Sequence, residues 1–398
     1  MKRRDSALPV SSRRRLSSGR IQGFSLVELM IALLLGLLIT GSMISVFIAT
    51  RAASRSTSGI ASLTDGGRVA LDFLQQAIRS AGYMACSTPA RTINSVTVGA
   101  SLTATDYVEP LGGYEAVGTS PGASLSSVSA TATTQVAADT KASDWTSTAA
   151  LGGALDSMLA GKVVQGSDVL VVHTLLTPTG SNPPTVYLTA PAAAGASTIT
   201  VSALGGLTAT GNPVILISNC ATSVAMQISS IAGTVITLAQ PLPAAFGAGS
   251  QVGEADTIAY YIGVDASSHN SALFVLDLGG AAVPTSSILP KELVPDIENM
   301  QILYGVDTTG TLAVTRYVTA DQVATATATA SGNFNGVINV RIAVMAASPL
   351  YAKPANPANG TVVLPPTLLL AGTTVQPPAD TRLRRVFETT VSVRNNTT

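Results

Sequence analysis

The chain has 398 residues, of which 46% are hydrophobic, 11% charged and 4% aromatic, and its mean hydropathy is +0.40. This length suits one large or two ordinary domains with a real apolar core. The formal net charge is zero, but residues 1–23 hold seven basic residues and one acidic residue, which leaves a net charge of −6 on the remainder. The remainder lacks the basic patch of a nucleic-acid-binding body, so no nucleic acid is expected as a partner.

The basic leader, residues 1–23, precedes an apolar run from Gly23 to Ile48, GFSLVELMIALLLGLLITGSMISVFI. A helix from Phe24 to Ile48 is roughly 37 Å long at about 1.5 Å per residue, enough to cross a hydrocarbon core of about 30 Å. We therefore predict a membrane-spanning segment over residues 24–50. The positive-inside rule places the leader in the cytoplasm and the acidic body outside.

Glu28 is the one charged residue in this apolar run. An ionised group costs about 2.5–3.5 kcal/mol at the centre of a span and less near the interface, so Glu28 needs a compensating partner. No lysine or arginine is near. Hydrolysis between Gly23 and Phe24 would create an α-ammonium group four residues upstream of Glu28, or supply one from a neighbouring copy.

The string Gly23-Phe24-Ser25-Leu26-Val27-Glu28, after a basic leader and before an apolar run, resembles the class III signal of type IV pilins and pseudopilins. The resemblance implies that a prepilin peptidase cleaves between Gly23 and Phe24, that Phe24 is N-methylated, and that Glu28 guides docking into a filament. The alternatives are an ordinary signal anchor and a cleaved secretory signal. A secretory signal ends in a small-residue cleavage site after its apolar run, whereas here the glycine precedes the run.

Residues 51–82 continue the helix as an amphipathic second half, with Gly82 as its stop and with weak points at Gly59 and the pair Gly66-Gly67. Apolar residues recur at intervals of three and four, which predicts one buried face. They are Ile60, Leu63, Ala70, Leu71, Leu74, Ala77, Ile78 and Ala81.

Residues 83–166 are rich in Ala, Ser, Thr and Gly and are predicted to form a variable insertion. Composition does not choose between a surface excursion with short strands and a partly mobile segment. Trp145 is interpreted as a local packing anchor rather than a ligand platform.

Residues 167–398 are predicted to form a β-rich globular body with an antiparallel sheet, because short β-branched or apolar runs alternate with Gly, Pro, Asn and Ser. The predicted strands are Val169 to Leu176, Thr198 to Val201, Val214 to Ser218, Thr234 to Leu238, Thr257 to Ile262 and Leu273 to Leu276.

The two cysteines, Cys86 and Cys220, lie in a chain that is predicted to be exported, where disulfides persist. An even number of cysteines in an oxidising compartment favours a disulfide between them over two buried free thiols. The spacing offers no CxxC, so redox catalysis and a zinc site have little support.

Several separate blocks resemble the minor pilins of the PilW type. The first is the helix end, where Gly67-Arg68 and Ala81-Gly82-Tyr83 lead to Cys86. The others are Asp168-Val169-Leu170, Ser218-Asn219-Cys220, Leu293 to Asp307, Arg316-Tyr317-Val318, Phe334 to Met345 and Arg384 to Asn395. The resemblance implies a type IV pilin-like α+β fold, a long N-terminal helix packed on a C-terminal antiparallel sheet.

No catalytic constellation is found. His173 and His269 are the only histidines and do not form a metal or triad spacing, so we predict no enzyme activity, no cofactor and no metal site. His173 is interpreted as a packed or rim residue, and His269 as an exposed turn residue. The acidic pairs Glu254 with Asp256 and Asp296 with Glu298 are interpreted as solvated edges or turn caps.

The PilW-type resemblance implies a minor pilin that takes part in assembly and initiation of a type IV pilus, in a priming complex at or near the tip, supporting twitching motility and adhesion. Its expected partners are the prepilin peptidase, other minor pilins, the major pilin and a tip adhesin. It is expected in the inner membrane with its body in the periplasm, and then in the pilus at the cell surface. The alternatives are a minor pseudopilin of a type II secretion system and a membrane-anchored periplasmic enzyme or ligand-binding module.

Overall fold

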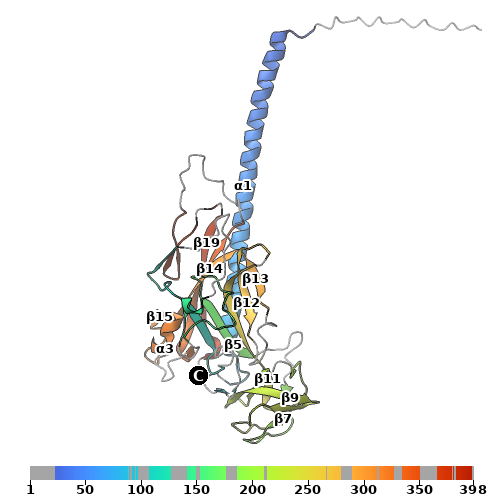
Figure 1. Cartoon of the computed structure of the whole chain (residues 1–398), viewed down its shortest axis with the longest axis vertical. Coiled ribbons are helices and arrows are strands. Elements are labelled where there is room, and N and C mark those ends of the chain that lie inside the picture. The colour runs from blue at the N-terminus through green and yellow to red at the C-terminus, as the bar shows by residue number, and fades with distance from the viewer. Residues whose placement is uncertain are drawn as a thin grey trace, which may run out of the picture. The chain divides into compact units, whose positions relative to one another are not determined.

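The structure is a computed structural model in which the described residues are 23–87, 89, 92–94, 96, 107–126, 141–148, 153–175, 186–209, 213–265, 267–278, 289–311, 313–326, 334–349, 365–378, 380 and 382–396. Except for Gly23, the predicted leader lies outside these residues. The chain divides into two compact units, Met1–Ser54 and Arg55–Thr398. Figure 1 traces the chain and labels its elements.

Helix α1 runs from Leu26 to Ser80, so the two predicted helical segments form one 55-residue helix that continues through Gly59, Gly66 and Gly67. Gly82 follows the helix with φ of +71°, a left-handed conformation that glycine adopts at little cost, and the predicted stop is confirmed.

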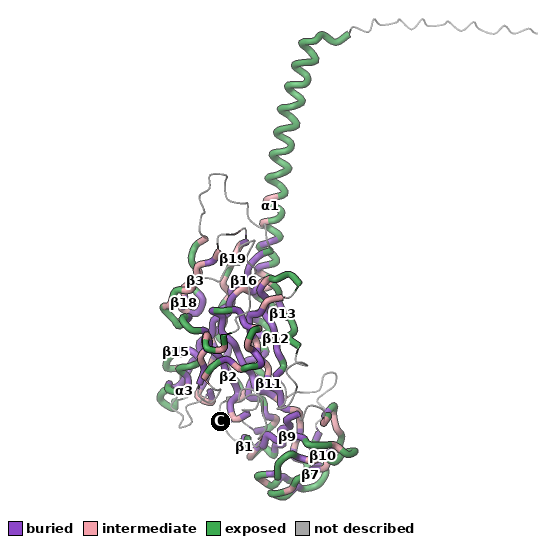
Figure 2. Tube along the Cα trace, in the orientation of Figure 1, coloured by how far each residue is buried: buried purple, intermediate pink, exposed green. Residues whose placement is uncertain are grey.

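The second half of α1 is buried at every third or fourth residue, and Figure 2 shows the change from exposed to buried along the helix. The predicted stripe is confirmed except at Ile60, which is 51% exposed. The buried residues of α1 are Gly59, Leu63, Gly67, Ala70, Leu71, Leu74, Ala77 and Ile78.

The described residues after α1 form a mainly antiparallel β body, which confirms the α+β class, and each of the six predicted strands is present. The strands in the first half of the chain are β1 (Thr92–Asn94), β2 (Leu111–Ala116), β3 (Ser124–Ser126), β4 (Trp145–Thr146), β5 (Val169–Leu175), β6 (Val186–Tyr187) and β7 (Thr198–Thr200). They are followed by β8 (Val214–Ser218), β9 (Ser223–Ala232), β10 (Val235–Leu238), β11 (Gln251–Val264), β12 (Ser271–Asp277), β13 (Lys291–Pro295) and β14 (Ile297–Val306). The last are β15 (Arg316–Val318), β16 (Val337–Ala347), β17 (Leu368–Leu370), β18 (Thr373–Gln376) and β19 (Arg384–Ser392), with a short helix α3 (Val323–Ala326).

Among the described residues, the largest sheet has the order β4-β2-β5-β11-β8-β9-β10-β7, with β12, β13, β6 and β1 attached beside this path. Strand β11 connects its two parts. Its first residues, Gln251–Glu254, pair with β8, whereas Ala255–Tyr260 pair with β5 and Ile258–Val264 pair with β12.

The β6–β10 module, residues 186–250, closes on itself. Strand β6 pairs with the start of β11, β11 with β8, β8 with β9, β9 with β10, and β10 with β7. An isolated bridge between Leu188, next to β6, and Val201, next to β7, then closes the ring. Its own apolar core includes Ile217, Met226 and Phe246. No Asp, Glu, Lys or Arg occurs anywhere from Val169 to Gly253, so this module is held by apolar packing and backbone pairing without ion pairs.

A second sheet has the order β15-β14-β16-β19 and packs against the second half of α1. Residues of α1, β5, β14 and β16 share one apolar core, which contains Leu74, Ile78, Met300 and Ile342. A third small sheet, β17-β18-β3, adds Leu370 and Val375 to a separate cluster with Leu303 and Met345.

The link segment, Gly166-Ser167-Asp168, joins the two larger sheets. The Asp168 carboxylate accepts backbone N–H groups from Ala116 of β2 at 2.9 Å and from Ile302 of β14 at 2.8 Å. Further bonds run from Asn299 and Gln301 side chains to the Gly166 carbonyl. One buried carboxylate therefore satisfies a backbone donor on each of two strands that do not pair with each other.

The structure places part of the predicted variable region, residues 83–166, inside the largest sheet. Strand β2 is fully buried between β4 and β5. Its sequence, LGGYEA, hides this because glycine has low strand propensity. Gly113 is needed for packing, since a Cβ there would collide with the Tyr304 hydroxyl. Trp145 is confirmed as a packing residue, and its indole N–H donates to the Ser167 carbonyl at 2.8 Å.

The interpretation of the acidic pairs as solvated edges or turn caps was wrong for Asp256 and Glu298, whereas Asp296 does lie in the turn between β13 and β14. Asp256 is buried in β11, because this strand is covered on both faces. Asp296 and Glu298 pair with Arg382 and Arg384 of the chain's C-terminal part, at 2.9 and 2.5 Å. Sequence separation of more than eighty residues hid these pairs.

Stability should fall as the pH rises, because burial raises the pKa of Glu115, Asp168 and Asp256. Glu115 and Asp168 also hydrogen-bond to each other, so protonated Glu115 donates to the Asp168 carboxylate. The folded chain binds more protons than the unfolded chain above about pH 4, so the free energy of unfolding decreases as the pH rises toward the folded-state pKa values. We expect the full chain in detergent to have a lower Tm at about pH 8 than at about pH 5, and the fall to be smaller in Glu115→Gln. An equal fall in both proteins would contradict this assignment.

Two neighbouring glycines of α1 should respond oppositely to alanine. A Cβ at Gly67 would collide with the Phe387 ring of β19, whereas a Cβ at Gly66 would lie 3.8 Å from Val294, in ordinary contact. Gly67→Ala is expected to lower the free energy of unfolding by about 1–3 kcal/mol through overpacking, and Gly66→Ala to raise it by up to about 1 kcal/mol through helix propensity. Denaturant titration of both variants is the measurement, and effects of equal sign would contradict the predicted contact.

Candidate functional site

The start of α1 carries the residues that the sequence singles out for processing and assembly. Ser25 immediately precedes the helix, and its Oγ accepts the backbone N–H of Glu28 at 3.2 Å. Ser25 is therefore the N-cap and Glu28 the third helical residue, the spacing of a capping box. Glu28 also lies in the first turn, where the helix dipole favours a negative charge.

The Ser-x-x-Glu spacing is that of a capping box, in which the Glu28 side chain would also accept the Ser25 backbone N–H. A glutamine at the same position can serve a capping box as well as glutamate, but it carries no charge. The two roles of Glu28, capping and charge pairing, can therefore be separated by experiment.

The surface around Glu28 is apolar and open within its own unit. Every residue from Gly23 to Thr50 is exposed, and Phe24 is 81% exposed. The helix is long and apolar enough to cross a membrane. It can therefore serve as a membrane anchor.

The few polar side chains of this segment are satisfied by the helix itself. Thr40 donates to the Gly36 carbonyl at 2.7 Å, Ser42 to the Ile39 carbonyl at 2.8 Å, and Ser45 to the Ser42 carbonyl at 2.7 Å. Such bonds leave no hydroxyl donor unpaired at these positions, which suits a helix in hydrocarbon. Glu28 is thus the residue of this segment whose charge is not neutralised within the helix.

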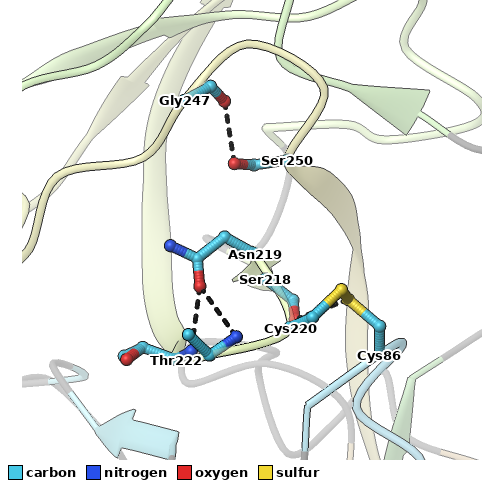
Figure 3. Close-up of a disulfide and its surroundings, with 8 residues drawn as sticks. Cys86, Ser218, Asn219, Cys220, Thr222, Gly247 and Ser250 are labelled. Atoms are coloured by element: carbon cyan, nitrogen blue, oxygen red, sulfur yellow. Dashed lines mark hydrogen bonds between the residues drawn. A yellow bond between two sulfur atoms is a disulfide. The ribbon is translucent and has the colours of Figure 1, made fainter.

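A disulfide joins Cys86, after the end of α1, to Cys220 in the turn between β8 and β9, the pairing that the sequence favours. The two Cα atoms are 4.5 Å apart and 134 residues apart in the chain. Figure 3 shows the bridge beside Ser218 and Asn219. It connects the end of the long helix covalently to the β6–β10 module.

The turn that holds Cys220 is shaped by its neighbours. The Asn219 side-chain oxygen accepts backbone N–H groups from Ala221 at 3.1 Å and Thr222 at 2.9 Å. Cys220 itself has φ of +68°, a conformation that is uncommon outside glycine. Next to the bridge, β1 pairs in parallel with β9, and the Thr92 and Ser223 hydroxyls lie 2.6 Å apart.

Other chemistry-bearing residues are structural. His173 is buried on β5, and its Nδ1 lies 2.8 Å from the Glu109 carbonyl, whereas His269 is exposed, as both interpretations expected. Within the part of the chain that the structure describes, no group of three or more His, Cys, Asp or Glu could hold a metal ion.

Residues 259–395 match the sequence profile of a family described as Type IV Pilus-assembly protein W, PilW. The match begins within β11 and ends beyond β19, so it covers the α1-packed sheet but neither α1 nor the β6–β10 module. No curated protein matches the chain. The matched segment supports a PilW-type family and suggests a non-enzymatic role in type IV pilus assembly, with other pilus-assembly components as partners and a membrane or cell-surface location.

Loss of the disulfide should destabilise the body. Chain-entropy models assign a loop of this length about 4–5 kcal/mol, and we expect Cys86→Ser and Cys220→Ser each to lower the free energy of unfolding by about 2–4 kcal/mol. Denaturant titration with and without reductant is the measurement. Reductant should cause the same loss in the wild type and no further loss in either variant; a wild type indifferent to reductant would show that the thiols are not paired.

Proposed function

We propose that this chain is a minor pilin that takes part in assembly and initiation of a type IV pilus. The observation that carries the proposal is an exposed apolar helix with a single carboxylate in its first turn, in a chain whose C-terminal sheet matches a pilus-assembly family. A helix of this kind suits two successive surroundings, first lipid and then the apolar helices of neighbouring subunits.

The proposed sequence of events begins in the inner membrane, with the leader in the cytoplasm and the body in the periplasm. The prepilin peptidase hydrolyses the Gly23–Phe24 peptide bond, which releases the leader, residues 1–23, and leaves an α-ammonium group on Phe24. N-methylation of Phe24 keeps a protonatable amine at this position. Glu28, one helical turn away, then has a cationic partner on its own chain or on a neighbour.

Glu28 acts in this proposal as the docking residue. In apolar surroundings an unpaired carboxylate is costly, so a subunit position that supplies an ammonium group is favoured over positions that do not. Contacts between different patches of successive subunits are heterologous and generate a filament rather than a closed ring. The other minor pilins and the major pilin are the proposed neighbours, in a priming complex at or near the tip that supports twitching motility and adhesion.

The body contributes contacts rather than catalysis in this proposal. A tip adhesin remains a further candidate partner. The alternative, a minor pseudopilin of a type II secretion system, uses the same helix and docking logic. Deletion of the gene distinguishes the two, because loss of motility supports the pilus and loss of exoprotein secretion supports the secretion system.

The charge of Glu28 should be required for incorporation, and its capping role should not suffice. We expect wild-type protein from sheared pili to have a methylated Phe24 terminus by mass analysis. Glu28→Ala and Glu28→Gln should both be cleaved but at least about tenfold depleted from the pilus fraction, a factor that corresponds to about 1.4 kcal/mol of docking free energy.

Glu28→Gln is the informative control because glutamine keeps the capping box and removes the charge. Normal incorporation of Glu28→Gln together with failure of Glu28→Ala would assign the residue to helix capping. An intact Met1 leader in the mature protein would reject processing at Gly23 and Phe24.

A further inference from the structure

Strand β19 is an edge strand of the α1-packed sheet. It has nine residues, Arg384–Ser392, and within the described residues it pairs with β16 and with no other strand. Its inner face packs through Phe387 and Val391 toward α1. One side of its backbone therefore faces away from the sheet.

The register identifies which backbone groups face outward. At one end of the β16–β19 ladder, Val393 N–H donates to the Ile338 carbonyl at 3.0 Å, and at the other end Ser348 N–H donates to the Leu383 carbonyl at 2.8 Å. Hydrogen-bonded pairs alternate along an antiparallel ladder, so odd-numbered residues of β19 bond to β16. The even-numbered residues present their N–H and C=O groups at the outer edge, and these are Arg384, Val386, Glu388, Thr390 and Ser392.

Other edges in the described part of the chain are protected or short. Strand β13 has five residues and ends in Pro295, which lacks a backbone N–H and discourages strand addition. Strand β15 has three residues, and the β6–β10 module closes on itself. Glu388, Thr390 and Ser392 are exposed, whereas Val386 packs against the β17–β18 cluster, so the second half of the strand is the part that can form several backbone hydrogen bonds to an added strand.

We propose that the outer edge of β19 receives an extended β-strand from a different subunit of the same filament. The identity of the partner as a filament subunit rests on the proposed function, whereas the strand-addition geometry does not. The edge lies within residues 259–395, the segment that matches the pilus-assembly family, whereas the β6–β10 module lies outside it.

Charge on the strand favours a different protein over a second copy. Antiparallel pairing of two β19 strands about their middle would place Glu388 opposite Glu388, and directly opposed like charges destabilise a sheet. Glu388 is already paired with Arg341, and Arg384 with Glu298 and Asp380. Arg385 is exposed and lies over the Phe387 ring, so a partner strand with a carboxylate near this residue fits best.

Hydrogen exchange of the purified full chain in detergent tests whether the edge is open. Amides of Val386, Glu388 and Thr390 should exchange much faster than those of Phe387, Thr389 and Val391, which bond to β16. Equal protection of both sets would show that another part of this chain already covers the edge and would overturn the proposal.

A photo-crosslinking residue at Ser392 in the full-length chain, expressed in cells that lack the native gene, tests the partner. We expect a covalent adduct with another filament subunit, mapped by mass spectrometry to an extended segment of that subunit. In the same background, Thr390→Pro removes one outward N–H without removing a bond to β16 and should lower the adduct by about tenfold or more. Thr390→Val keeps this N–H and should leave the adduct unchanged.

Three results would overturn the proposal: an adduct between two copies of this chain, an adduct with a protein outside the filament, or an adduct unaffected by Thr390→Pro. The same crosslinker at Thr198 in β7 should not capture that subunit segment. Failure of the proposed function is seen separately, as absence of the wild-type protein from sheared pili, because that assay does not involve β19.

Discussion

The Asp168 carboxylate is the constraint on which the body depends. Its two oxygens accept backbone donors from β2 and β14, strands of two sheets that share no ladder. Removing this side chain would leave two buried N–H groups unpaired, and an unsatisfied buried donor costs about 1–3 kcal/mol. Glu115 hydrogen-bonds to Asp168, and this bond needs one proton on the pair. The junction is therefore most stable when one of the two carboxyl groups is protonated. The long helix then packs on a surface to which both sheets contribute.

Helix α1 is continuous, but its two halves differ in burial. From Arg55 onward its apolar stripe lies against β strands, and Gly67 lets the Phe387 ring approach closely. Before Ser54 it has no buried residue, and its hydroxyls bond to its own carbonyls. Glu28 remains as the residue whose charge calls for a partner outside the helix. The proposed assembly role uses apolar contacts of the N-terminal half of α1. The proposed strand docking uses backbone hydrogen bonds of β19, near the other end of the sequence.

The β6–β10 module adds a third kind of surface. It has no charged side chain, it folds around its own core, and it is tied to the helix end by the Cys86–Cys220 bridge and the β1–β9 pairing. It lies outside the family match and belongs to the largest sheet, not to the α1-packed sheet. Strand β11 pairs with β8 of the module and with β5 of the largest sheet, so the module is connected by a continuous ladder instead of a flexible linker.

The sequence by itself determined the features that depend on local pattern. Helical periodicity gave the extent of α1 and its stop at Gly82, and β-branched runs gave six strands, because both patterns are written in neighbouring residues. It also singled out Gly23, Phe24 and Glu28, whose roles stay predictions until their processing is measured. Tertiary structure alone decided what long-range contacts control: the burial of β2 despite its glycines, the ion pairs of Asp296 and Glu298, the position of Asp168 between two sheets, and the place of β19 at the edge of its sheet among the described residues. Each depends on residues far apart in the chain, and a single sequence carries no local signal for such pairings.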